Sequence, residues 1–106
     1  MIYNTLGKTG LKVSRLGFGT MRLPTINSHA DIDEVEATKM FDHAIENGVN
    51  IFDTAYPYHC DTLAGNGNCE TFLGEYLKEN NLRDEIILQT KSPHCLFKKE
   101  AILIYI

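Results

Sequence analysis

The chain has 106 residues, of which 43% are hydrophobic and 23% charged, and its formal net charge is −4. This length allows about one small domain, and the balance of residue types is that of an ordinary globular protein. The absence of a Lys and Arg cluster argues against a nucleic-acid-binding surface. The longest apolar run, residues 101–106, is far shorter than the roughly 20 residues of a membrane-spanning helix.

The three cysteines are an odd number in a chain that shows no export signal. A signal peptide would begin with a charged segment followed by an apolar run, and the N-terminus, Met1–Asn4, has neither feature. We therefore expect free thiols, a reducing compartment and a cytoplasmic location.

The first predicted element is a β-hairpin. Extended segments flank the turn-rich stretch Gly7–Gly10, which predicts a hairpin over residues 2–14. The Gly-Lys-Thr in this turn is not a phosphate-binding loop, because that motif needs a glycine where this chain has Ile2. Residues 16–20 follow as a short strand whose glycines allow close approach to a ligand or to another strand.

The clearest predicted helix runs over residues 33–47. Its apolar residues recur at the helical spacing i, i+3, i+4, i+7 and i+8, namely Ala37, Met40, Phe41, Ala44 and Ile45. Asp31 or Asp33 can cap the N-terminus, and Gly48 suits the C-terminal end. The opposite face is charged, and we interpret His43 on that face as a solvated histidine.

A strand over residues 50–54, a helix over 69–80 and a strand over 85–90 complete the pattern. Cys69 lies on the apolar stripe of the second helix, which favours a small core residue over a ligand. The alternation of strand and helix indicates βαβ units and a parallel sheet. We expect one domain over residues 1–106, since nothing between these elements reads as a linker.

Polar groups follow all three predicted strands. In parallel α/β folds functional side chains gather at the carboxyl ends of the strands, and Asp53 and Lys91 lie at two of these ends. Neighbouring strands lie about 4.8 Å apart, so these two side chains could form an ion pair beside Tyr58. The same three residues could also be an ordinary buried salt bridge with a packing tyrosine.

A functional interpretation of these side chains is carbonyl reduction. A free tyrosine titrates near pH ~10, too high for efficient proton donation at neutral pH. A neighbouring ammonium favours the phenolate, and a carboxylate can hold that ammonium in place. No side chain supplies a hydride, so a nicotinamide cofactor would have to bind.

The sequence also resembles the aldo-keto reductase family over about residues 2–97. The likeness is carried by three segments: Lys12–Met21, Asn50–Ala55 with Tyr58 after it, and Ile87–Lys91. It implies an α/β fold, a (β/α)8 TIM barrel whose bottom is closed by the N-terminal hairpin, of which this chain supplies the hairpin and the first three β/α units. It also implies NADPH-dependent reduction of small-molecule aldehydes and ketones.

By this resemblance Tyr58 is the proton donor, and Lys91 and Asp53 tune it. The residues that the resemblance places along the cofactor are Gly19, Thr20, Met21 and Asp53. The chain is similar to a bacterial branch in which some members append a ferredoxin-like iron–sulfur segment.

The chain departs from the family pattern in two ways. The family's catalytic histidine follows a fourth strand, and neither His59 nor His94 matches its position. Residues 98–106 turn apolar where a third helix would begin. With three of eight strands the barrel would stay open, so we expect unpaired sheet edges and self-association. The alternative function is therefore a truncated, inactive remnant or a self-associating part-barrel.

We expect no metal site. The candidate ligands lack the close Cys-x2-4-Cys spacing of a structural zinc site; they are His59, Cys60, Cys69, His94 and Cys95. A thiolate nucleophile at Cys60 or Cys95 has equally little support, because a Cys and a His adjacent in sequence seldom face each other.

Overall fold

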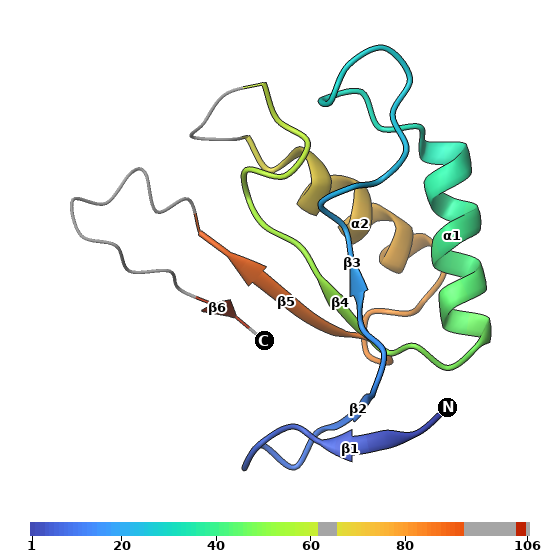
Figure 1. Ribbon diagram of the computed structural model, residues 1–106, viewed down its shortest axis with the longest axis vertical. Coiled ribbons are helices and arrows are strands. Elements are labelled where there is room, and N and C mark those ends of the chain that lie inside the picture. Colours follow the sequence, from blue (N-terminus) through green and yellow to red (C-terminus); the bar gives the residue numbers. More distant parts are fainter. Residues whose placement is uncertain (62–65, 93–103, 106) are drawn as a thin grey trace.

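The computed structural model describes residues 1–61, 66–92 and 104–105. Its elements follow the predicted order through the third strand of the parallel sheet (Figure 1). They are β1 (Tyr3–Thr5), β2 (Lys12–Ser14), β3 (Phe18–Gly19), α1 (Glu34–Glu46), β4 (Ile51–Asp53), α2 (Asn68–Glu79), β5 (Ile87–Lys91) and β6 (Ile104–Tyr105). The predicted hairpin, strands and helices are thus confirmed, with bounds that differ by a few residues.

The hairpin β1–β2 lies at the end of the sheet where the parallel strands begin (Figure 1). The Asn50 side chain, just before β4, holds it there. Asn50 Oδ1 accepts a hydrogen bond from the backbone N–H of Ser14, and Asn50 Nδ2 donates to the carbonyl of Lys12, both at 2.8 Å. The Tyr3 hydroxyl donates to the carbonyl of Gly48 at 2.8 Å. The hairpin therefore covers the bottom of the sheet, as the family resemblance implied.

The main sheet has the strand order β3-β4-β5-β6, and β3, β4 and β5 are parallel. The register places Gly19 beside Asp53 and Asp53 beside Gln89. This parallel arrangement confirms the predicted βαβ organisation. The sheet does not close on itself within the residues that the structure describes.

One expectation about the sheet edges is wrong. We expected both edges to be unpaired, but β6 pairs antiparallel with the end of β5 at residues 90–91. The physical reason is that Ile104 and Tyr105 are good strand formers and supply backbone groups to the free side of β5. The outer edge of β3 has no strand partner among the described residues.

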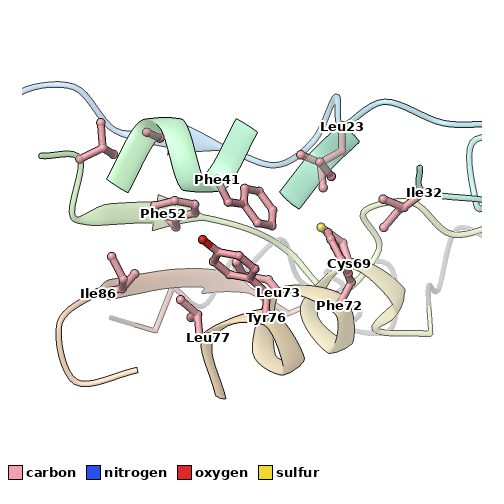
Figure 2. Packing of buried hydrophobic residues seen from close by; sticks show 13 residues of the cluster. Leu23, Ile32, Phe41, Phe52, Cys69, Phe72, Leu73, Tyr76, Leu77 and Ile86 are labelled. Carbon is pink, nitrogen blue, oxygen red and sulfur yellow. The ribbon is translucent and has the colours of Figure 1, made fainter. Parts of the chain in front are cut away.

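The hydrophobic core lies between the two helices and one face of the sheet (Figure 2). Phe41 of α1 is fully buried, and its ring contacts Phe52 of β4 and Tyr76 of α2, with centroids 5.5 and 5.0 Å apart. Cys69 is also fully buried, which confirms its predicted place in the core. Met40 was predicted on the buried stripe but is 42% exposed, because it faces a groove beside β3 rather than α2.

Local contacts set the ends of α1. The Asp33 carboxylate accepts a hydrogen bond from the N–H of Glu36 at 3.2 Å, and Gly48 follows the helix at a positive φ of 92°. His43 is exposed, as predicted. In the described part of the chain, neither helix is long and apolar enough to cross a membrane.

Candidate active site

The candidate site lies at the carboxyl ends of β4 and β5, opposite the hairpin (Figure 1). Side chains alternate between the two faces of a strand. Phe52 points into the core and is fully buried, so the next residue, Asp53, points to the other face, where it is partly exposed. Lys91 ends β5 and reaches the same face. The alternation of faces along the two strands therefore brings the two charged residues together, as the sequence predicted.

The Lys91 ammonium is the centre of the site. The three hydrogens of its Nζ are shared among four oxygens: both Asp53 carboxylate oxygens at 2.7 Å, the carbonyl of Thr54 at 3.2 Å and the Tyr58 hydroxyl oxygen at 3.3 Å. Burial alone would lower the pKa of Lys91, but the hydrogen bonds to Asp53 and Tyr58 and the charge of Asp53 raise it above its ordinary value. Lys91 is therefore a fixed positive charge at neutral pH.

Tyr58 stands beside this charge in the loop after β4. Its backbone N–H donates to the carbonyl of Ala55 at 3.1 Å, which closes a turn and directs the side chain toward Lys91. The Lys91 Nζ lies 5.1 Å from the centroid of the ring. Because the phenol oxygen accepts a hydrogen bond from the ammonium, its own O–H hydrogen must point elsewhere. Tyr58 is partly exposed and can direct that hydrogen toward a ligand.

The residues expected along a cofactor lie in two environments. An added side-chain carbon at Gly19 would meet no atom within 4 Å among the described residues, and Met21 is 49% exposed. Thr20 is fully buried instead. Its backbone N–H and its hydroxyl both donate to the carbonyl of Asp53, at 3.0 and 2.9 Å. Thr20 therefore fixes the backbone beneath Asp53, while its two neighbours face open space.

Sequence reasoning gave no role to His59, and the structure places this residue under the site. Its side chain is fully buried, and its backbone has a positive φ of 56°. Its ring contacts the carbonyls of Thr20 and His29 and the N–H of Leu23. No local pattern could have indicated this, because a histidine in a predicted polar loop is normally exposed.

Cys60 and Cys69, the two cysteines that the structure describes, do not form a second reactive centre. Burial raises the pKa of the Cys69 thiol, which disfavours the thiolate form. The Cys60 sulfur donates to the side-chain oxygen of Asn66 at 2.9 Å. In residues 1–61, 66–92 and 104–105, no three His, Cys, Asp or Glu side chains are grouped to hold a metal ion. His94 and Cys95 lie outside the described residues.

The comparisons with known proteins identify the family of this chain. The family model described as "Aldo/keto reductase family" matches residues 15–103. The chain belongs to the aldo/keto reductase family. It is 40% identical over 92 residues to the uncharacterized oxidoreductase YrpG of Bacillus subtilis, covering 86% of this chain and 26% of that protein. It is 39% identical over 90 residues to 6-dehydroglucose reductase of Novosphingobium aromaticivorans, covering 84% of this chain and 28% of that protein.

A solved structure shows how this aldo/keto reductase chain relates to complete members of the family. An aldo-keto reductase from Bacillus halodurans, in its holo form, matches with a TM-score of 0.66 and 34% identity. The match covers 97% of this chain and 30% of that structure. The chain thus spans about a quarter to a third of the length of these relatives. The predicted fold class, part of a (β/α)8 barrel that does not close, is confirmed.

Proposed function

We propose that this chain carries the proton-donating part of an oxidoreductase site that reduces the carbonyl group of a small aldehyde or ketone with NADPH. The single observation that supports this is the Lys91 ammonium held between the Asp53 carboxylate and the Tyr58 phenol. An ordinary structural salt bridge has no need of a partly exposed phenol hydrogen-bonded to its cation. A proton donor has that need, because its own hydrogen must face the substrate.

In this proposal each residue has a separate role. Tyr58 donates its proton to the oxygen of the carbonyl as negative charge develops there. Lys91, 3.3 Å from the phenol oxygen, stabilises the negative charge left on Tyr58 as the proton leaves. Asp53 holds Lys91 by two short hydrogen bonds and so fixes the direction of the ammonium. These roles account for the partial exposure of all three side chains.

The residues present fit a nicotinamide cofactor beside this site. Gly19 pairs with Asp53 across the sheet, and the space above it is open, so a flat ring could approach the backbone there. Gly19, Met21 and Asp53 would contact the cofactor, and Thr20 would support Asp53 from below. When bound, NADPH would supply the hydride that no side chain can provide. The free thiols of Cys60 and Cys69 agree with a cytoplasmic location, which we also propose.

A second function is favoured by the outer edge of β3, which has no strand partner in residues 1–61, 66–92 and 104–105. The groove beside this edge is lined by apolar side chains, among them Leu16 at 63% and Met40 at 42% exposure. An exposed apolar groove next to an unpaired strand edge promotes association with another chain. Under this alternative the chain is an inactive part-barrel that associates with itself.

The test compares the purified chain with its Tyr58→Phe variant. NADPH binding is titrated by fluorescence, and NADPH oxidation is followed with and without a panel of aldehydes and ketones. The proposed function predicts NADPH binding and carbonyl-dependent oxidation by the unmutated chain, and retained binding without oxidation in the variant, whereas the inactive part-barrel predicts little NADPH binding. Equal turnover by the two proteins would contradict the role of Tyr58. Absence of NADPH binding, together with a concentration-dependent increase in mass by light scattering, would favour the self-associating part-barrel.

A further inference from the structure

His59 is a buried residue for which the proposed reaction has no direct use. It directly follows Tyr58 in the chain, its side chain is fully buried, and its φ of 56° lies in the left-handed region. We propose that His59, together with Asn68, is a positioning residue that holds Tyr58 against Lys91. This inference rests on the proposed function, because it concerns the same site.

The ring of His59 joins the loop after β4 to the loop between β3 and α1. The ring Nδ1 lies 2.8 Å from the carbonyl of His29, and Nε2 lies 3.2 Å from the N–H of Leu23 and 3.1 Å from the carbonyl of Thr20. In a neutral ring with the hydrogen on Nδ1, two of these backbone groups are paired, since Nδ1–H donates to His29 and Nε2 accepts from Leu23. The other tautomer pairs only Thr20. The hydrogen-bond count therefore favours the Nδ1–H form.

The backbone of His59 is held from a third direction. The Asn68 side-chain N–H2, in the first turn of α2, donates to the carbonyl of His59 at 2.9 Å and to the carbonyl of Ala30 at 2.7 Å. His59 and Asn68 thus connect three segments: the loop of residues 20–33, the loop after β4 and the start of α2. We call this set of contacts the His59 clamp.

The His59 clamp reaches both sides of the candidate site. On one side, the left-handed backbone at His59 lets its own side chain turn inward while Tyr58 stays at the surface beside Lys91. A non-glycine residue in that conformation persists where the surrounding contacts compensate for its strain. On the other side, the carbonyl of Thr20 lies against the ring, and the hydroxyl of Thr20 donates to the carbonyl of Asp53.

A histidine in a packed interior can also be a purely structural residue with no influence on Tyr58. The two interpretations differ in where the damage appears when the ring is removed. A structural role predicts a general loss of stability with an unchanged site in the molecules that stay folded. A positioning role predicts that Tyr58 leaves Lys91 while the helices and the core stay in place.

The experiment uses a nuclear magnetic resonance signal of Lys91. Because Lys91 Nζ lies 5.1 Å from the centroid of the Tyr58 ring, the adjacent methylene protons should show nuclear Overhauser contacts with the ring protons and a chemical-shift displacement by the aromatic ring current. This signal is measured in the unmutated chain and in three variants. His59→Gly removes the ring but keeps the left-handed backbone. His59→Asn tolerates that backbone and places an N–H donor near the position of Nδ1. His43→Asn, at an exposed histidine on α1, is the matched control.

We expect His59→Gly to lose the nuclear Overhauser contacts between the Tyr58 ring and Lys91 and the ring-current displacement, with the helical circular dichroism retained. His59→Asn should restore part of the displacement, and His43→Asn should leave it unchanged. A His59→Gly chain that is folded and keeps the full displacement would overturn the proposal. So would an unmutated chain in which Lys91 shows no nuclear Overhauser contact with the Tyr58 ring.

A measurement on the unmutated chain covers the case in which His59→Gly does not fold. Long-range ¹⁵N–¹H correlation identifies which ring nitrogen carries the hydrogen, and we expect Nδ1–H for His59 with slow hydrogen exchange at the N–H of Leu23. An Nε2–H ring with fast exchange at Leu23 would refute the His59 clamp. Turnover of Tyr58→Phe tests the proposed function, whereas the contacts between Tyr58 and Lys91 in the His59 variants test the clamp. Failure of either proposal is thus distinguished from failure of the other.

Discussion

The two ends of the parallel sheet use polar side chains in different ways. At the hairpin end, the amide of Asn50 is bound to backbone groups of Ser14 and Lys12 in the hairpin. At the opposite end, the polar side chains bind one another, and the Tyr58 phenol keeps a hydrogen that no group among the described residues accepts. Satisfied side chain–backbone bonds stabilise a fold, whereas a charged, partly exposed cluster with spare capacity is suited to chemistry.

This difference follows from the direction of the strands. Parallel strands place all their carboxyl ends at one edge of the sheet, and the loops that leave this edge carry the side chains free to vary. The other edge receives the incoming chain and the hairpin. A change at the hairpin end should therefore alter stability, and a change at the carboxyl end should alter activity.

The largest expected effect is on activity at the carboxyl end. Tyr58→Phe removes the proton donor and keeps the ring, so we expect carbonyl reduction to fall by about 10²–10⁴-fold, the usual contribution of general acid catalysis. The thermal midpoint should change little, because within the described part of the chain the Tyr58 hydroxyl has one hydrogen bond, at 3.3 Å. Steady-state turnover and circular dichroism on the same preparation check both statements. A large loss of stability with unchanged turnover would reverse the assignment of the two ends.

The matching change at the hairpin end is Asn50→Ala. It removes hydrogen bonds to Ser14 and Lys12 that join the hairpin to the sheet, so we expect the free energy of unfolding to fall by about 2 kcal/mol. NADPH affinity per folded molecule should be unchanged. Urea denaturation gives the first quantity and cofactor titration the second. Asn27→Ala, in an exposed loop, serves as the control and should leave both unchanged.

Much of this contrast was predictable from the sequence. The strand and helix periodicities gave the order of elements, and the alternation of faces in a strand brought Asp53 and Lys91 together. Asp33 was one of two proposed caps for α1, and the structure selects it. These features depend on residues close together in sequence or on the regular geometry of strands, which a single sequence specifies well.

Features that depend on how loops fold over one another were not predictable. The burial of His59 follows from the path of residues 20–30, which carry the three backbone groups that contact its ring. The exposure of Met40 depends on what covers the groove beside β3, and the pairing of β6 depends on two residues of an apolar tail. Each is set by tertiary contacts between distant segments rather than by a local pattern.

Lys91→Met tests whether the carboxyl end also stabilises the fold. The change leaves the Asp53 carboxylate without its partner, and we expect a loss of about 1–2 kcal/mol in the free energy of unfolding at neutral pH. Asp53 is partly exposed, so water compensates for part of the lost pair. Lys39→Met, which breaks a more exposed ion pair with Glu36, is the matched control and should change stability much less. A larger loss of stability in Lys39→Met than in Lys91→Met would show that burial does not determine how much each ion pair stabilises the fold.

The effect of Lys91→Met on stability is predicted to depend on pH. The pKa of Lys91 is raised in the folded chain above its ordinary value of 10.5. Its charge therefore stabilises the fold fully below pH 10.5, and this contribution is lost as the pH rises through the higher folded pKa. The difference in stability between the unmutated chain and Lys91→Met should be constant at neutral pH and shrink in strong alkali. Urea denaturation of both proteins from pH 7 to about pH 12 measures it.

The smallest expected effect lies in the helical layer, away from both ends of the sheet. The Tyr76 hydroxyl donates to the carboxylate of Asp42 at 2.6 Å and joins α2 to α1. Burial and this hydrogen bond raise the pKa of Tyr76 well above its ordinary value, so its neutral form stabilises the fold until strongly alkaline pH. Tyr76→Phe should cost about 1 kcal/mol, since the ring stays in the core and water reaches Asp42.

The variant Tyr76→Phe also tests whether the two ends of the sheet depend on the helical layer that supports them. Neither Tyr76 nor Asp42 contacts Lys91 or Asn50, so turnover and the hairpin contacts should both be unchanged when the α1–α2 hydrogen bond is lost. Urea denaturation, carbonyl-dependent NADPH oxidation and the Lys91 ring-current displacement are measured together on this variant. If the displacement falls with stability, the position of Tyr58 depends on the helical packing as a whole. If the displacement stays constant while stability falls, its position depends on the loops at the carboxyl end, as the His59 clamp requires.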